Sequence, residues 1–275
     1  MAIDSMRCPP FIDIPGVANF RDIGCCSNVD ATYVRRGLVF RSADLSHITA
    51  EGTNELQALR IRKIFDLRSM KEITPARNEN SQYEAWLASP KGAERICVPI
   101  FQDEDFAPEA LAVRFKDYSA KGTDGFERAY RTILLNAGPA IAAILTQLCI
   151  PTRILINCAA GKDRTGVVVM IFLLLAGCST EAIAREYHLT EEGLGISWKA
   201  EAVGRLLNHP TFRNGDVQDV ERMVGAREEV MTAVIEMVER EWGDVEDYLL
   251  KVVGITETMV HKCKSVLRGE VNGVC

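Results

Sequence analysis

The chain has 275 residues, and its 47% hydrophobic and 25% charged content is typical of a folded domain, which excludes collagen-like and disordered classes. Its 32 basic and 38 acidic residues give a net charge of −6, so no basic field is available for nucleic acid, and an anionic ligand would need a local site. The nine cysteines contain no C-x-x-C pair, which indicates free thiols in a reducing, cytoplasmic compartment and argues against a disulfide framework or a zinc ribbon.

The first part of the chain alternates between strand-like and helix-like segments. We expect strands over 33–40, 63–67 and 95–98, and a first helix with Thr49 as its N-cap. The segment 101–124 has no clear pattern and is predicted to be an irregular loop or lid. This alternation predicts an α/β fold with a central parallel or mixed sheet flanked by helices.

The middle of the chain carries its most apolar segments. A helix is predicted over 126–149, kinked at Gly138-Pro139, and the clearest strand of the chain follows over 153–157. The next predicted helix, 165–176, is apolar almost all round and therefore buried. Its apolar run of ten residues is too short for a membrane span, which needs about 20.

The rest of the chain is predicted to be helical. The expected helices cover 180–188 with Thr180 as N-cap, 216–242, 244–253 ending at Gly254, and 256–267 ending at Gly269. Because no repeat or linker divides the sequence, we expect one domain over 1–275, with a catalytic core at about 15–190 and a helical part at about 191–270.

The segment between the strand 153–157 and the following helix carries the chemistry. It reads Cys158-Ala159-Ala160-Gly161-Lys162-Asp163-Arg164-Thr165-Gly166. The backbone N–H groups of 159–164 lie near a helix N-terminus, where amides and the helix dipole form an anion site. Small side chains leave the concavity open, and Arg164 offers a planar fork for two phosphate oxygens. Cys158 lies at the base, where the same field favours its thiolate.

These residue types support nucleophilic attack on a bound phosphate. A thiolate beneath the phosphate can attack phosphorus in line and form a phosphocysteine, while the amides and Arg164 hold the developing charge. Thr165 is expected to hydrogen-bond the sulfur and ease its departure. No metal or other cofactor is needed for this chemistry. The Gly161-Lys162 pair is no ATP-binding Walker loop, because that motif needs Gly at 156 and Ser or Thr at 163.

The spacing Cys158-x5-Arg164, followed by Thr165-Gly166, resembles the signature of cysteine-dependent protein tyrosine and dual-specificity phosphatases. The full string resembles the atypical bacterial and fungal tyrosine-phosphatase family, whose members also act on phosphoserine, phosphothreonine and phosphoinositides. Further motifs that look like those of this family are Asn19-Phe20-Arg21-Asp22-Ile23-Gly24, Arg41-Ser42-Ala43-Asp44-Leu45, Phe65-Asp66-Leu67-Arg68-Ser69 with Glu72, and Tyr248-Leu249-Leu250.

The resemblance spans about 15–268 and implies a tyrosine-phosphatase-like fold. One departure concerns the residue before the nucleophile, which is usually His in these enzymes and helps to set the basicity of the thiolate. Asn157 stands there in this chain.

Departure of the leaving group needs a proton donor, and the sequence has no Trp-Pro-Asp motif. Asp66 lies at the C-terminal end of a predicted strand, where α/β sites collect, and the matching aspartate of the resembling family has been considered as the acid. Asp163 lies inside the loop, and Asp103 or Asp105 lies in the predicted lid. A structural ion pair is the competing interpretation for each. Lys162 is either a second cationic contact for the substrate or a solvated surface lysine.

The leading hypothesis is a metal-independent phosphatase that hydrolyses phosphomonoesters, with a phosphorylated protein as partner. The alternatives are the same fold acting on a small phosphate or diphosphate ester in specialised metabolism, and a non-catalytic phosphate-binding module. The sequence predicts neither a nucleic-acid partner nor a membrane span, and it leaves the oligomeric state open.

Overall fold

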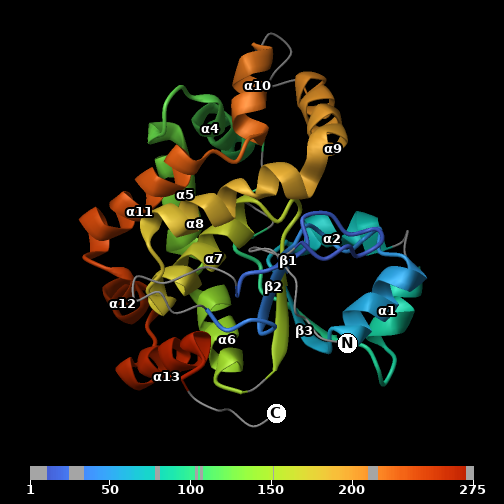
Figure 1. Ribbon diagram of the computed structural model, residues 1–275. Helices are drawn as coiled ribbons and strands as arrows, with labels where there is room; N and C mark the ends of the chain where they lie inside the picture. The colour runs from blue at the N-terminus through green and yellow to red at the C-terminus, as the bar shows by residue number, and fades with distance from the viewer. Residues whose placement is uncertain are drawn as a thin grey trace.

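A five-stranded sheet lies at the centre of the molecule, with helices on both faces (Figure 1). The computed structural model describes residues 11–24, 34–77, 81–102, 105, 108–150, 152–209 and 216–270. The strands are β1 Arg21–Asp22, β2 Val39–Ser42, β3 Ile61–Asp66, β4 Glu94–Cys97 and β5 Arg153–Asn157. The helices are α1 Ala50–Ala58, α2 Met70–Arg77, α3 Ser81–Leu87, α4 Pro108–Ser119, α5 Asp124–Asn136, α6 Gly138–Leu148, α7 Asp163–Ala176, α8 Thr180–His188, α9 Thr190–Leu207, α10 Val217–Val224, α11 Glu228–Trp242, α12 Val245–Tyr248, the π-helical η3 Leu249–Val253 and α13 Glu257–Arg268.

The strand order is β1-β2-β5-β3-β4, in which β1 is antiparallel to β2 and the other pairs are parallel. The sheet is therefore mixed, and the predicted fold class is confirmed. In the register, Asn157 at the end of β5 lies between Ser42 of β2 and Asp66 of β3. Ligand sites of open α/β sheets lie beyond the carboxyl ends of such strands.

The central strand β5 is apolar on both faces because helices cover both sides of the sheet. Ile154 and Ile156 belong to the larger core, which α5, α6, α7, α8, α11 and α13 share, whereas Leu155 belongs to the smaller core with α1 and α3. This alternation with period two is the reason that a run without polar residues forms a strand here. Helix α7, which follows β5, is buried along most of its length and ends at Gly177, whose φ of 87° caps the helix.

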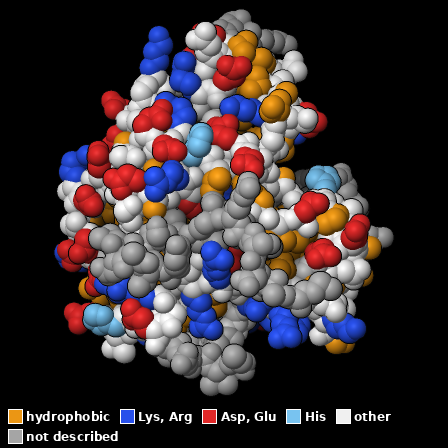
Figure 2. Space-filling model, viewed as in Figure 1, with side chains coloured by type: hydrophobic (Ala, Val, Ile, Leu, Met, Phe, Trp, Pro, Cys, Tyr) orange, Lys and Arg blue, Asp and Glu red, His pale blue; other side chains and the backbone are white. Residues whose placement is uncertain are grey.

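Charged side chains of both signs are interspersed on the face of the molecule in Figure 2, and hydrophobic side chains gather near its top, where α9 and α10 lie. Ile196 of α9 and Val217 of α10 are both exposed, at 89% and 48%. None of the described helices is both long and apolar enough to cross a membrane. The cytoplasmic location stays a prediction.

The prediction of an irregular loop over 101–124 is wrong in its central part, because 108–119 forms helix α4. The tertiary structure stabilises this helix: Tyr118 is buried, and its ring makes edge contacts with Phe126 at 5.2 Å and Tyr130 at 6.2 Å between ring centroids. The predicted strand 33–40 is observed as β2, which begins and ends later, at Val39 and Ser42, and residue 33 lies outside the described residues.

Two predicted helices are each divided in the structure. The predicted helix 126–149 consists of α5 and α6, which are separated at Ala137 because Pro139 starts a new helix instead of bending the old one. The predicted helix 216–242 consists of α10 and α11. Gly225 has an extended backbone there, and the Glu191 carboxylate accepts a hydrogen bond from the N–H of Ala226.

The remaining helix ends agree closely with the sequence. Thr49, Asp216 and Thr256 are N-caps whose side chains accept hydrogen bonds from the first turn. The N-cap of α8 is Ser179, one residue before the predicted Thr180. The predicted helix 244–253 changes from α-helix to π-helix at Leu249.

Candidate active site

The segment 158–164, here called the phosphate loop, connects the end of β5 to α7, and its carbonyl groups are held from outside. The carbonyl oxygen of Ala159 accepts a hydrogen bond from the N–H of Asp44 at 3.0 Å, and that of Ala160 accepts one from Asn19 Nδ2 at 3.0 Å. The carbonyl oxygen of Gly161 accepts one from Arg41 Nη2 at 2.6 Å. Because the carbonyls bind outward partners, the N–H groups of the loop are left for a ligand. None of the N–H groups of 159–163 donates to a protein acceptor among the described residues.

The loop turns at Gly161, and only glycine fits there. Its φ is +64°, in the left-handed region, and a Cβ at this position would lie 2.2 Å from the carbonyl oxygen of Ser42. The close approach of the loop to the end of β2 therefore depends on this residue.

Cys158 and Arg164 lie close enough to influence each other. Cys158 is 3% exposed. Burial would lower the pKa of Arg164, but the hydrogen bonds to Glu72 and the charge of Cys158 raise it above its usual value. The guanidinium therefore stays charged beside the thiol.

Glu72 of α2 fixes the direction of the Arg164 side chain. Its two carboxylate oxygens each accept a hydrogen bond from the guanidinium at 2.7 Å, and Oε2 also accepts one from the N–H of Ser69 at 3.0 Å. Burial would raise the pKa of Glu72, but the hydrogen bonds and charge of Arg164 outweigh it and lower that pKa. A bidentate pair of this kind restricts a flexible arginine to one orientation.

A buried group of charges supports the loop from behind. Glu186 of α8 accepts hydrogen bonds from Arg21 Nε at 2.7 Å and from Arg41 Nη1 at 2.6 Å, and both arginines are fully buried. Arg21 in turn donates to the side-chain oxygen of Asn19. Asn19 and Arg41 hold the carbonyls of Ala160 and Gly161, so Glu186 links α8 to the conformation of the loop.

Asp66 lies at the end of β3, where the sequence places it, but both of its carboxylate oxygens are engaged. Arg68 donates to Oδ1 from Nε at 2.9 Å and to Oδ2 from Nη2 at 2.8 Å. Asp66 is 1% exposed. These contacts are those of a structural ion pair.

Asp163 has a different environment. Its Oδ1 accepts a hydrogen bond from the hydroxyl of Tyr130 at 2.7 Å, and that hydroxyl lies 2.7 Å from the hydroxyl of Tyr187. The Asp163 side chain is 28% exposed. No hydrogen bond among the described residues involves its Oδ2.

The Lys162 side chain is not solvated, and its ammonium group lies at the end of α10, 3.5 Å from Asp163 Oδ1. Its Nζ donates to the carbonyl oxygens of Met223 at 2.6 Å, Gly225 at 3.2 Å and Val224 at 3.3 Å, and the residue is 4% exposed. The three donors of the ammonium group therefore match three acceptors at the end of α10. This contact joins the phosphate loop to α10.

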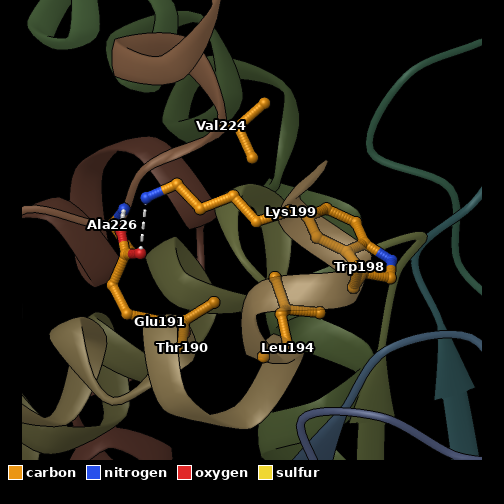
Figure 3. A pocket seen from close by; sticks show the side chains of 8 residues that line it. Thr190, Glu191, Leu194, Trp198, Lys199, Val224 and Ala226 are labelled. Carbon is orange, nitrogen blue, oxygen red and sulfur yellow. Dashed lines mark hydrogen bonds and ion pairs between the residues drawn. The ribbon is translucent and has the colours of Figure 1, made fainter. Parts of the chain in front are cut away.

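A cavity of about 350 Å³ lies between the phosphate loop and α9 and α10. Its lining consists of Ala160, Lys162, Asp163, Trp198, Ala202, Arg205, Leu206, His209, Met223 and Val224. Trp198 and Val224 also line a smaller neighbouring pocket, where Glu191 accepts hydrogen bonds from Lys199 at 2.9 Å and from the N–H of Ala226 (Figure 3). The loop thus supplies one wall of the cavity, and two helices distant in sequence supply the other.

Other predicted site residues have fewer contacts. Asn157 is fully buried and neither polar atom of its side chain has a hydrogen-bond partner among the described residues; the same holds for the hydroxyl of Thr165. Asp103 lies outside the described residues, and Asp105 Oδ2 accepts a hydrogen bond from the N–H of Gln102 at 2.8 Å. No three His, Cys, Asp or Glu side chains in the described ranges form a group that could hold a metal ion.

Sequence reasoning did not assign four residues of this site: Asn19, Tyr130, Glu186 and Tyr187. Asn19 belongs to a motif that the sequence did single out. The other three lie on helices whose apolar spacing predicts which face is buried, but not which polar side chain on that face reaches the loop.

Residues 12–269 match the tyrosine phosphatase family. The chain belongs to this family. It is 26% identical to the triple specificity protein phosphatase PtpB of Mycobacterium tuberculosis, over 94% of this chain and 99% of the relative. It is 24% identical to a tyrosine-protein phosphatase of Nostoc commune, over 93% of this chain and 84% of the relative. The family assignment made from the loop motif is confirmed, and the match covers the helical C-terminal part as well as the sheet.

Proposed function

We propose that this member of the tyrosine phosphatase family hydrolyses phosphomonoesters through a phosphocysteine intermediate and needs no metal. The observation that carries this proposal is the phosphate loop, whose carbonyls of Ala159, Ala160 and Gly161 bind outward partners while its N–H groups remain available above Cys158. Arg164, oriented by Glu72, supplies a positive charge near Cys158. Such preorganised donors stabilise charge that develops on the equatorial oxygens of phosphate.

In the first step, the Cys158 thiolate attacks phosphorus, the sulfur–phosphorus bond forms and the ester bond breaks. The leaving oxygen takes a proton from the carboxyl group of Asp163. In the second step, Asp163 accepts a proton from water, whose oxygen attacks phosphorus and displaces the sulfur. Inorganic phosphate leaves and the thiolate is restored, so the electrons and protons balance over one turnover.

The contacts favour Asp163 over Asp66 as the proton donor. Both oxygens of Asp66 accept hydrogen bonds from Arg68, and the residue is almost fully buried. Asp163 is partly exposed, lines the cavity beside the loop and has one oxygen without a hydrogen-bond partner among the described residues. A general acid must be within hydrogen-bond reach of the leaving oxygen. Asp163 can use Oδ2 for this while Oδ1 keeps its contacts with Tyr130 and with Lys162, whereas Asp66 would have to give up a hydrogen bond from Arg68.

The cavity beside the loop supports substrates with an organic group attached to the phosphate. Trp198, Leu206 and Met223 give it apolar surface, and Arg205 is also part of its lining. Phosphotyrosine is the substrate class that we propose first, because the chain belongs to the tyrosine phosphatase family, with phosphoserine, phosphothreonine and phosphoinositides next. The mycobacterial relative is named a triple specificity protein phosphatase, which supports a specificity wider than one class. A small phosphate ester would occupy the same cavity, so a substrate panel must include one.

The decisive experiment compares Cys158→Ser with the wild type on p-nitrophenyl phosphate and a phosphotyrosyl peptide, in the presence of a metal chelator. We expect the substitution to lower kcat/KM by roughly 10³-fold or more while the circular dichroism spectrum stays unchanged. Cys178→Ser is the matched control, because Cys178 is also buried, at 5%, but lies after the other end of α7.

Two results would overturn the proposal. One is full activity of Cys158→Ser, and the other is a wild type that turns over only after a metal ion is added. Asp163→Asn is expected to lower kcat by about 10²–10⁴-fold, which is the usual contribution of a general acid. A larger loss with Asp66→Asn than with Asp163→Asn, in folded protein, would return the assignment to Asp66.

A further inference from the structure

We propose that Tyr130 and Tyr187 are positioning residues for catalysis, which hold the carboxyl group of Asp163 so that its Oδ2 is left to donate the proton. This inference rests on the proposed function, in which Asp163 is the general acid. It assigns a role to two buried hydroxyl groups that the reaction itself does not consume.

The direction of the hydrogen bonds is fixed by the chemistry of the groups. Tyr130 of α5 donates its hydroxyl proton to Asp163 Oδ1 at 2.7 Å. Its oxygen can then only accept from Tyr187 of α8, whose hydroxyl lies 2.7 Å away. A single chain of donors therefore runs from α8 through α5 to the first residue of α7, and each bond polarises the next.

Both hydroxyl groups keep their protons under working conditions. Burial, followed by the charge of Asp163, raises the pKa of Tyr130 well above its usual value, and burial with the same charge raises that of Tyr187. Tyr130 and Tyr187 are 0% and 1% exposed. They therefore remain hydrogen-bond donors throughout the pH range in which a phosphatase is assayed.

The two rings cannot easily change position. The Tyr130 ring makes edge contacts with Phe126 at 5.9 Å, Tyr118 at 6.2 Å and Tyr187 at 6.3 Å between ring centroids. The Tyr187 ring lies against the first turn of α7, since a Cβ on Gly166 would be 3.1 Å from its Cδ2. A donor held this rigidly selects one rotamer of the Asp163 side chain.

The two carboxyl oxygens of Asp163 therefore have different environments. Oδ1 is occupied by Tyr130, with Lys162 Nζ at 3.5 Å as a further contact, whereas Oδ2 has no hydrogen bond among the described residues.

Another buried tyrosine offers a comparison. Tyr248 is also 0% exposed, but its hydroxyl donates to the backbone carbonyl of Leu134 at 2.8 Å and not to Asp163. Its substitution therefore measures the cost of a lost buried hydroxyl without an effect on the acid.

The test is the dependence of kcat/KM on the leaving group, measured with a series of aryl phosphates from p-nitrophenyl phosphate to phenyl phosphate. Tyr130→Phe keeps the ring and removes the donor. We expect about tenfold lower kcat/KM for phenyl phosphate and a much smaller change for p-nitrophenyl phosphate, because good leaving groups depend less on the acid. Tyr187→Phe should give a smaller change of the same kind. Tyr248→Phe, the matched control, should leave the leaving-group dependence unchanged even if it lowers the melting temperature.

A second measurement combines the substitutions. In the Asp163→Asn background, Tyr130→Phe should have no further effect on phenyl phosphate, because the group that it positions is absent. The proposal is overturned if Tyr130→Phe lowers kcat/KM equally for all leaving groups, or if its effect adds fully to that of Asp163→Asn.

These results also separate this proposal from the proposed function. If Asp163→Asn itself leaves the leaving-group dependence unchanged, the acid assignment fails and the role of Tyr130 fails with it. If Asp163→Asn steepens that dependence and Tyr130→Phe does not, only the role of Tyr130 is wrong. Inactivity of Cys158→Ser is independent of both outcomes.

Discussion

Glu186 is the residue whose replacement tests the support of the phosphate loop most directly. It is 4% exposed and is paired with Arg21 and Arg41, which are both fully buried. Glu186→Gln keeps the shape of the side chain but removes the charge. Its amide NH₂ group then faces one of the two arginines, and both groups are hydrogen-bond donors, so no hydrogen bond forms between them. The two guanidinium groups then lack their common carboxylate, and Arg41 is the residue that binds the carbonyl of Gly161.

The expected size of the effect follows from that burial. Removal of one partner from a buried ion pair costs about 3–5 kcal/mol, because it leaves a charge without compensation. A folded domain is stable by about 5–15 kcal/mol, so the variant should fold but unfold roughly 10 °C lower. We also expect a lower kcat/KM, since the loop carbonyls lose part of their support.

The acid dependence gives an independent readout. Burial would raise the pKa of Glu186, but the charges of Arg21 and Arg41 outweigh it and lower that pKa below its usual value. Glu186 therefore contributes stability that is fully present above the pKa of the unfolded chain and is lost as the pH falls through the lower folded-state value. The variant has no carboxylate to protonate at this position and should lack this part of the acid destabilisation. The difference in the free energy of unfolding between the wild type and the variant should therefore shrink toward low pH.

Urea unfolding followed by circular dichroism, at neutral pH and at several acid values, measures both quantities. Glu236→Gln is the control, because Glu236 is exposed on α11 and has no ion pair among the described residues. The reasoning is refuted if Glu186→Gln has the same urea midpoint as the wild type at neutral pH. A midpoint difference that stays constant into the acid range would refute the charge argument alone.

Three further changes have defined outcomes. Gly161→Ala should lower kcat/KM for p-nitrophenyl phosphate by about 10²-fold, because the added Cβ would lie 2.2 Å from the backbone oxygen of Ser42. The control Gly122→Ala, at a φ of +75° with no atom within 4 Å of the added Cβ, should leave the kinetics unchanged. Equal effects of the two substitutions would show that this steric clash is not the cause. Glu72→Gln should raise the inhibition constant of orthovanadate about tenfold, because Arg164 loses its bidentate partner, and an unchanged constant would show that this pair does not orient the guanidinium. Cys263 should be the last described cysteine that iodoacetamide modifies, because burial raises its pKa; early labelling in peptide mass spectrometry would be inconsistent with that environment.

The sequence predicts the part of the site that is continuous along the chain. The strand over 153–157, the loop that follows and the buried helix α7 are found where their residues place them, because hydrophobic runs and a glycine turn are local signals. The same holds for the cap at Thr49. The predictions for 101–124 and 216–242 fail where the outcome depends on distant contacts. Helix α4 packs on α10, the end of α10 binds Lys162, and the N–H of Ala226 beyond it binds Glu191.

Lys162 shows why charge alone does not assign a role. From the sequence, a lysine within a phosphate loop has two natural interpretations, a substrate contact and a solvated surface group. Neither describes an ammonium group with three carbonyl acceptors at the end of a helix about 60 residues further along the chain. The C-terminal end of a helix leaves carbonyl groups without partners, so a buried cation can be stabilised there without a phosphate.

The choice between the two aspartates has the same physical origin. Asp66 and Arg68 are two residues apart, so their ion pair could be anticipated, and the structure places both carboxylate oxygens of Asp66 on Arg68. The hydroxyl group that Asp163 binds comes from Tyr130, 33 residues earlier, and that of Tyr187 comes from another helix again. A loop motif indicates which groups can react. The hydrogen-bond partners of each aspartate determine which one keeps an unoccupied oxygen, and the partners of Asp163 come from the packing of α5 and α8 against α7. In the proposed mechanism, the choice of the acid therefore depends on the helices α5 and α8 as much as on the loop. Substitutions in these helices should change the leaving-group dependence without a change in any residue proposed to touch phosphate.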